Sequence, residues 1–136
     1  FLKQKLSKKP LTVVGKGNQK RDFINVKDVS EAFIKCLNPK IKNEIINIGS
    51  SSPKKINYLV SLISKKKIHI PMRPGGPKIT HSSILKAKKI LKWKPKVNFE
   101  AGISELINNI NYWKDSPLWN KSNIKKATKN WFKYLK

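Results

Sequence analysis

Apolar residues recur at helical spacing in several stretches of the chain, and each stretch predicts a helix with one buried face. The clearest helix runs from a cap at Asp28 to Leu37, and a second long helix begins near Phe99. The predicted buried face of the first comprises Val29, Ala32, Phe33, Cys36 and Leu37. Further helices are expected over residues 1–8, 59–63 and 84–91, and from a cap at Ser122 to residue 135.

Short extended segments lie between these helices. Leu11–Val14 is rich in β-branched residues and is followed by a glycine turn, while residues 44–48 and 68–70 also predict strands. Residues 71–77 are rich in Pro and Gly and predict an irregular loop. This set of short strands and longer helices indicates a mixed α/β domain that is not a self-sufficient doubly wound sheet.

The composition is strongly basic, with 31 Lys and Arg residues against 7 Asp and Glu residues and a formal charge of +24. Such an excess raises a nucleic acid as a partner. The successive quarters of the chain contain 8, 8, 8 and 7 basic residues, so no binding stripe is concentrated in one region. We therefore interpret most of the charge as solvated surface. Trp131 lies on the inner stripe of the last predicted helix, which favours core packing over base stacking.

Cysteine and histidine usage exclude further classes. Cys36 is the only cysteine, so no internal disulfide and no cysteine-rich zinc site can form, and a reducing, cytoplasmic location is expected. His69 and His81 are isolated, so no metal site is predicted. No run of eighteen apolar residues is present, and no membrane partner is expected.

Several short motifs follow one another in a fixed order. Residues 15–29 contain G-x-G-x-Q-x-R-D-F followed by V-x-D-V, and residues 46–50 read I-N-I-G-S. Residues 73–77 read R-P-G-G-P, residues 91–95 read L-K-W-K-P, and residues 99–103 read F-E-A-G-I. Together they resemble the C-terminal part of the extended short-chain dehydrogenases, the class of NAD-dependent nucleotide-sugar epimerases and dehydratases that includes UDP-glucose 4-epimerase.

The resemblance implies a fold and a separate function for each half of the whole protein. In this family an N-terminal Rossmann half holds NAD, and a small mixed domain of short strands and several helices binds the nucleotide sugar. The chain contains neither a G-x-x-G-x-x-G fingerprint nor a Tyr-x-x-x-Lys pair. We therefore predict no catalytic and no cofactor-binding residue in it. Residues 1–114 are expected to form the substrate-binding part, and residues 115–136 a helical extension.

The resemblance also implies site residues. Arg21 and Arg73 fall on the motif positions that grip the sugar nucleotide's diphosphate, and they are the only arginines among 31 basic residues. A planar guanidinium holds two phosphate oxygens at once, which a lysine cannot do. Asn47 corresponds to a further diphosphate contact, and Thr12 and Val14 to the wall of the base pocket.

Each of these positions also has an ordinary structural interpretation. Arg21 can form a local ion pair with Asp22 or Asp28, while Arg73 can lie on the loop surface. Asn47 can bond its own backbone in a turn, and Thr12 and Val14 can be plain strand residues.

These observations lead to one main function and two alternatives. The main expectation is the part of an NAD-dependent epimerase or dehydratase that binds a UDP- or dTDP-linked sugar. Catalysis then needs an N-terminal Rossmann half, supplied by a longer chain or by a separate one, and self-association stays open. The alternatives are an inactive, decayed fragment, which departures such as Lys16 and Gly76 would suit, and a basic nucleic-acid-binding module. Whether the chain alone is an enzyme stays open.

Overall fold

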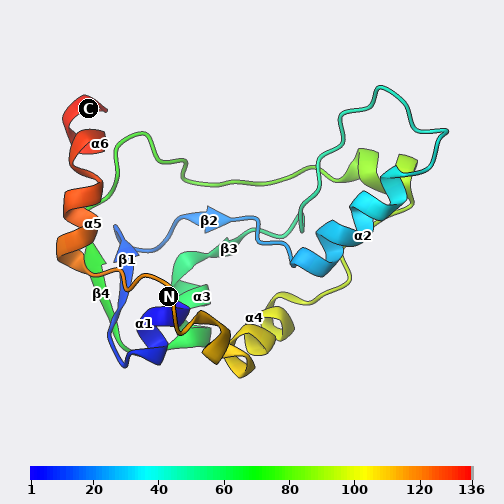
Figure 1. Cartoon of the computed structure of the whole chain (residues 1–136). Helices are drawn as coiled ribbons and strands as arrows, with labels where there is room; N and C mark the ends of the chain where they lie inside the picture. Colours follow the sequence, from blue (N-terminus) through cyan, green and yellow to red (C-terminus); the bar gives the residue numbers. More distant parts are fainter. Residues whose placement is uncertain (136) are drawn as a thin grey trace. The chain divides into compact units, whose positions relative to one another are not determined.

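The computed structural model describes residues 1–135, and the chain divides into two compact units that alternate along the sequence (Figure 1). Unit 1 contains residues 1–19, residues 55–78 and the chain from Ile103 onward. Unit 2 contains residues 20–54 and 79–102. The division at residue 114 expected from the sequence stays a prediction.

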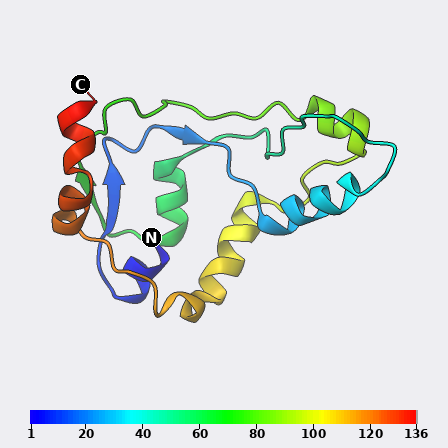
Figure 2. The same ribbon diagram turned by 45° about the horizontal axis from the view of Figure 1, so that its top comes forward.

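Unit 1 is built around a pair of parallel strands. Strand β1 (Leu11–Val14) pairs with β4 (Lys67–Ile70) in a register that places Val14 opposite Ile70. Figure 2 shows helix α3 (Ile56–Ile63, green) beside the blue arrow of β1, against which it packs. The remaining elements of unit 1 are α1 (Leu2–Leu6), η2 (Ile110–Trp113), α5 (Lys121–Ala127) and α6 (Lys129–Tyr134).

Alternation along β1 decides which of its side chains form the core. Leu11 and Val13 are fully buried, whereas Thr12 and Val14 on the opposite face are half-buried. Helix α3 contributes the buried side chains of Val60 and Ile63. Both strands and the helices expected near residues 1–8 and 59–63 are confirmed, because their patterns are local and unambiguous.

Unit 2 contains more irregular chain than regular structure. Strand β2 (Lys20–Arg21) pairs with the two-residue strand β3 (Lys54–Lys55), and Lys20 also forms a parallel bridge with Ile79. Its helices are α2 (Val26–Cys36), the π-helical turn η1 (Ala87–Leu91) and α4 (Phe99–Asn108), which begins in unit 2 and continues into the chain of unit 1.

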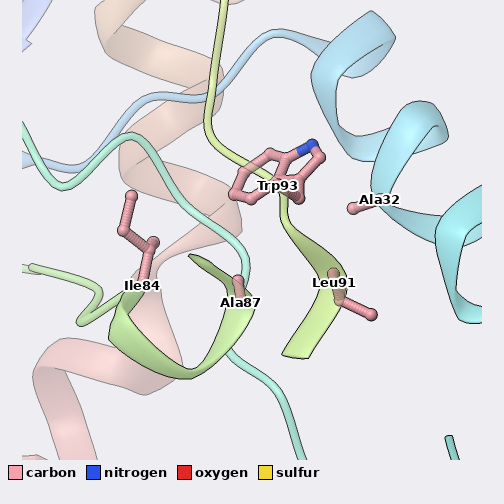
Figure 3. Packing of buried hydrophobic residues seen from close by; sticks show 5 residues of the cluster. All are labelled: Ala32, Ile84, Ala87, Leu91 and Trp93. Atoms are coloured by element: carbon pink, nitrogen blue, oxygen red, sulfur yellow. The ribbon is translucent and has the colours of Figure 1, made fainter. Parts of the chain in front are cut away.

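The core of unit 2 forms around one tryptophan. Trp93 is 1% exposed, and Figure 3 shows its indole ring close to Ala32 of α2, with Leu91 and Ala87 of η1 below it. Ile46 and Ile48 pack against this cluster from the irregular segment that follows α2. Non-helical residues 92–98 thus lie over the inner side of α2.

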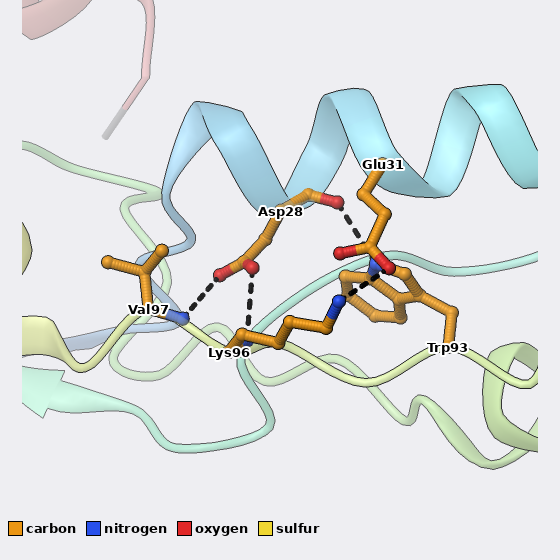
Figure 4. Close-up of polar contacts among 5 residues, drawn as sticks. All are labelled: Asp28, Glu31, Trp93, Lys96 and Val97. Carbon is orange, nitrogen blue, oxygen red and sulfur yellow. Dashed lines mark hydrogen bonds and ion pairs between the residues drawn. The ribbon is translucent and has the colours of Figure 1, made fainter.

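Asp28 fixes the same segment through hydrogen bonds (Figure 4). Asp28 is 2% exposed, and its carboxylate accepts hydrogen bonds from the backbone N–H groups of Lys96 (3.0 Å) and Val97 (3.1 Å). The indole Nε1–H of Trp93 donates to the Asp28 carbonyl over 3.0 Å. A buried carboxylate is tolerated because these N–H groups satisfy it.

Helix α2 differs from its prediction in two ways. Its N-cap is Asn25, whose side chain accepts from the Lys27 N–H at 2.9 Å, so the predicted cap at Asp28 is wrong. The helix buries the side that carries Asp28 and Ala32, whereas Phe33, Leu37 and Cys36 are exposed. Successive residues of a helix are about 100° apart, so Phe33 and Leu37 lie on a different side of α2 from Asp28 and Ala32 and face away from the unit 2 core. The predicted buried face is therefore wrong for these three residues.

Two other predictions from the hydrophobic pattern are also wrong. Residues 44–48 form no strand, because no segment of residues 1–135 pairs with them, although Ile46 and Ile48 face inward and Ile45 is 88% exposed. The last predicted helix is divided at Thr128 into α5 and α6 and begins at an Asn120 cap instead of Ser122. Along the described residues, no helix is long and apolar enough to cross a membrane.

Candidate functional site

Three of the five predicted site residues lie in unit 1. Thr12 and Val14 share the half-buried face of β1, and Arg73 follows β4 by three residues. The Thr12 hydroxyl accepts a hydrogen bond from the side-chain amide of Gln4 at 2.9 Å. Gln4 belongs to helix α1 and is 3% exposed, so this buried hydrogen bond connects α1 to the half-buried face of β1.

The turn after β1 adjoins the start of residues 71–77, the irregular loop that carries Arg73 and is called the arginine loop below. The Gly15 N–H donates to the Ile70 carbonyl at 2.8 Å, and His69 Nδ1 lies 2.6 Å from the Gly15 carbonyl. Gly15 has a φ of +58°, and a Cβ at this position would clash with the Met72 side chain. The segments that carry Val14 and Arg73 are therefore neighbours, and the left-handed φ of Gly15 favours glycine in the turn after β1.

Arg73 is held by the C-terminal helix. Its guanidinium lies 5.7 Å from the centre of the Trp131 ring, and the Trp131 Nε1–H donates to the carbonyl of Pro74 at 2.8 Å. Arg73 is only partly exposed. Trp131 is 40% exposed, so its predicted place in the core is wrong. Its contacts are with the arginine loop.

The other two predicted site residues, Arg21 and Asn47, lie in unit 2. Arg21 is half-buried in β2, and its Nη1 donates to the Lys20 carbonyl at 2.7 Å. Within residues 1–135, neither Asp22 nor Asp28 forms the ion pair with Arg21 that the sequence allowed. Both carboxylates accept hydrogen bonds from other groups.

Asp22 connects the Arg21 strand to the segment that follows Asn47. Its carboxylate accepts hydrogen bonds from the backbone N–H groups of Ser50 (3.1 Å), Ser51 (3.2 Å) and Ser82 (2.8 Å). The Ser50 hydroxyl and the Ser52 N–H also donate to it. A Cβ at Gly49 would clash with the Ser82 side chain, so glycine is required where these segments meet. Arg21 and the turn three residues after Asn47 are thus fixed together.

The hydrogen bonds to Asp22 affect its pKa. Burial alone would raise the pKa of this carboxyl, but hydrogen bonds from the Ser50 hydroxyl and the Ser82, Ser52 and Ser51 backbone outweigh it, and the pKa is lowered. A lowered folded-state pKa contributes stability at neutral pH, and this contribution is lost as the pH falls through that pKa.

We expect Asp22→Asn to lower the free energy of unfolding by about 1–2 kcal/mol at pH 7, because charge-assisted hydrogen bonds are lost at a partly solvated site. The difference between variant and wild type should begin to shrink near pH 4, the ordinary pKa range of an aspartate, and should disappear only as the pH falls through the lowered pKa of the folded carboxyl. Urea unfolding at pH 7, 4 and 3 measures it, with the exposed Asp115→Asn as control. A difference that is the same at all three pH values contradicts this account.

Comparison with known proteins was made with the whole chain. The family model described as GDP-mannose 4,6 dehydratase matches residues 1–106. UDP-glucuronate 4-epimerase of Thermodesulfobacterium geofontis is 30% identical over 131 residues, which cover 91% of this chain and 37% of the relative. A putative UDP-glucose 4-epimerase of Methanocaldococcus jannaschii is 33% identical and covers 79% of this chain and 36% of the relative.

Solved structures agree with these matches. UDP-glucuronic acid 4-epimerase of Bacillus cereus, in complex with UDP-glucuronic acid and NAD, superposes with a TM-score of 0.75 at 32% identity. The match covers 82% of this chain and 38% of the epimerase. UDP-glucose 4-epimerase of Thermotoga maritima with UDP-glucose gives a TM-score of 0.73 at 26% identity, covering 85% of this chain and 38% of that enzyme.

The fold and the motif order therefore define the C-terminal part of an extended short-chain dehydrogenase, as the sequence predicted. Within this class, the chain belongs to the family of NAD-dependent nucleotide-sugar epimerases and dehydratases. It spans little more than a third of the length of the relatives that it matches, between 35% and 37% for the first three curated ones.

Proposed function

We propose that this chain is the nucleotide-sugar-binding portion of an NAD-dependent epimerase or dehydratase and that it binds the ligand's diphosphate. The placement of its two arginines carries the proposal. Both are half-buried inside the region that matches the family model, whereas the other basic residues are lysines distributed along the whole chain. Two relatives of known structure were solved with UDP-glucuronic acid and UDP-glucose, which supports a UDP-linked ligand.

Each predicted residue receives one role in this proposal. The planar guanidinium groups of Arg21 and Arg73 each bind phosphate oxygens in bidentate fashion, and the Asn47 amide donates a hydrogen bond to a phosphate oxygen. Asn47 is exposed, so its amide is accessible to a ligand. Thr12 and Val14, on the half-buried face of β1, form part of the wall against the base.

If the arginines bind the diphosphate, UDP affinity should depend on the planar shape of the guanidinium as well as on its charge. Arg73→Lys keeps the charge but loses the planar fork, so we expect UDP to bind about 10-fold more weakly, and about 100-fold more weakly to Arg73→Ala. Arg21→Lys and Arg21→Ala should behave in the same way. Isothermal titration of this chain with UDP measures both effects.

A matched lysine variant separates this site from general attraction. Lys78→Ala removes one exposed charge a few residues after Arg73 and should change the affinity less than twofold. Equal losses in Lys78→Ala and Arg73→Ala, each of which removes one positive charge, would mean that UDP responds to overall charge alone. A folded chain that binds no UDP would refute the proposal and favour the inactive fragment.

We further propose that catalysis requires an N-terminal NAD-binding half and that this half covers the outer face of α2. This face consists of Val26, Phe33, Ile34 and Leu37, which are 67–80% exposed. The chain lacks the dinucleotide fingerprint, while matched structures contain NAD and are more than twice as long. Four large apolar side chains on one helix face are typical of a surface that another part of a protein buries.

A cytoplasmic location is part of the same proposal and is supported by the single, exposed Cys36. Binding to nucleic acid is the weaker alternative. It predicts an affinity that falls steeply with added salt. The even distribution of the lysines gives it no specific support.

A further inference from the structure

The C-terminal helix α6 contacts the arginine loop at two places through one side chain. The indole N–H of Trp131 donates to the carbonyl of Pro74, and the face of the same ring lies against the Arg73 guanidinium at 5.7 Å. All three residues belong to unit 1. Trp131 lies beyond residues 1–106, where the family model ends.

The arginine loop has few other constraints of its own. Gly75 has a φ of +68°, and a Cβ there would meet no atom within 4 Å, so the loop tip is unpacked. The Gly76 N–H contacts the Arg73 carbonyl at a long 3.4 Å. A loop of two glycines between prolines keeps much backbone freedom. An anchor on the Pro74 carbonyl therefore restricts the segment that carries Arg73.

Trp131 belongs to a C-terminal segment whose own conformation is fixed by hydrogen bonds. Asn120 and Asn123 form a reciprocal capping box at the start of α5, and the Thr128 hydroxyl donates to the Ile124 carbonyl at 2.8 Å. The buried Gln4 amide donates to the Trp119 carbonyl at 2.7 Å, which ties this segment to the N-terminal helix. These hydrogen bonds fix the start of the C-terminal segment that carries Trp131.

We propose that Trp131 is a positioning residue that holds the Arg73 guanidinium ready for a phosphate group of the nucleotide sugar. This inference rests on the proposed diphosphate role of Arg73. Stacking on an indole restricts the many rotamers of a free arginine and leaves the edge of the guanidinium for a ligand. Binding then loses less conformational entropy, so the ligand is held more tightly.

The first test needs no ligand. Because the chain has only two arginines, a ¹⁵N NMR spectrum of arginine Nε–H groups contains two signals, which Arg21→Lys and Arg73→Lys assign. Trp131→Ala removes the ring and should move the Arg73 signal while leaving the Arg21 signal in place. Trp131→Phe keeps an aromatic face and should move it less. Trp119→Phe, at another exposed tryptophan, should move neither signal.

The second test measures UDP affinity. Trp131→Ala should weaken UDP binding about 5- to 10-fold and Trp131→Phe about 2- to 3-fold, with Trp119→Phe unchanged. In an Arg73→Ala background, Trp131→Ala should have no further effect, because the two residues act as one unit. A structural role would instead weaken binding equally in both backgrounds.

The outcomes separate this inference from the proposed function. If Arg73→Ala weakens UDP binding about 100-fold but Trp131→Ala does not alter it, the positioning role is refuted and the function stands. If the Arg73 signal does not respond to Trp131→Ala, the positioning role is refuted whatever the ligand does. If the signal responds but wild type binds no UDP, the diphosphate role fails while the Trp131–Arg73 contact is supported.

Discussion

Trp93→Ala is expected to lower the free energy of unfolding of unit 2 by about 3–5 kcal/mol, the range for removing a buried large aromatic side chain. The ring is 1% exposed, and its neighbours Ala32 and Ala87 are too small to fill the space that it leaves. The Asp28 carbonyl also loses its indole donor. Since a domain has only about 5–15 kcal/mol in total, this change is expected to remove a large share of the stability of unit 2.

Two further variants divide this effect into its parts. Trp93→Phe keeps most of the apolar contact and loses the hydrogen bond, so we expect a smaller loss of about 1–3 kcal/mol. Trp119→Ala removes a tryptophan that is 49% exposed and should cost less than about 1 kcal/mol. Urea unfolding followed by circular dichroism measures all three. Equal stability of Trp93→Ala and Trp119→Ala would show that unit 2 is not organised around Trp93.

The motifs that identify the family include several positions whose role here is structural. Asp28, in V-x-D-V, holds the backbone of Lys96 and Val97, and Trp93, in L-x-W-x-P, packs on the same helix. Asp22, in R-D-F, holds the serine turn. These motif positions thus hold together the segments that carry Arg21 and Asn47.

Local patterns predicted the local structure well. The β-branched run at Leu11–Val14 and the pattern around Phe99 each gave the element that forms, because neighbouring residues determine it. Residues 44–48 are rich in the β-branched residue isoleucine, which favours a strand, but a strand needs a partner, and the described chain provides none. The side chains predicted for the buried face of α2 are mostly apolar, but Phe33 and Leu37 are exposed, because no segment of the described chain packs against them.

The candidate site was predictable only where a motif marks it. Arg21, Arg73, Asn47, Thr12 and Val14 come from motif positions, and their ligand role stays a proposal. Trp131 was assigned to the core because its helical spacing is regular, whereas its partner Pro74 lies 57 residues earlier. Asp22 and Ser82 are 60 residues apart. No spacing rule connects such pairs, so only a structure could reveal them.

The double variant Phe33→Asp, Leu37→Asp is expected to have the largest effect in a complete enzyme and almost none in this chain. We propose a chimera in which this chain replaces the matching C-terminal part of the Thermodesulfobacterium geofontis epimerase, 37% of its length. If the NAD-binding half covers the α2 face, each buried apolar side chain contributes about 1.5–3 kcal/mol. The chimera should therefore lose about 3–6 kcal/mol of unfolding free energy, and its UDP-glucuronate epimerisation with it.

The contrast between the chimera and the isolated chain makes this prediction specific. In the isolated chain the two side chains are 71% and 80% exposed, so the charges remain in water and stability should change by no more than about 0.5 kcal/mol. Leu106→Asp, at an exposed leucine of α4, provides the matched control and should leave the chimera folded and active. If the double variant destabilises both proteins equally, the face is already part of this chain's own packing. If it affects neither, the NAD-binding half lies elsewhere, because no buried apolar face tolerates two carboxylates.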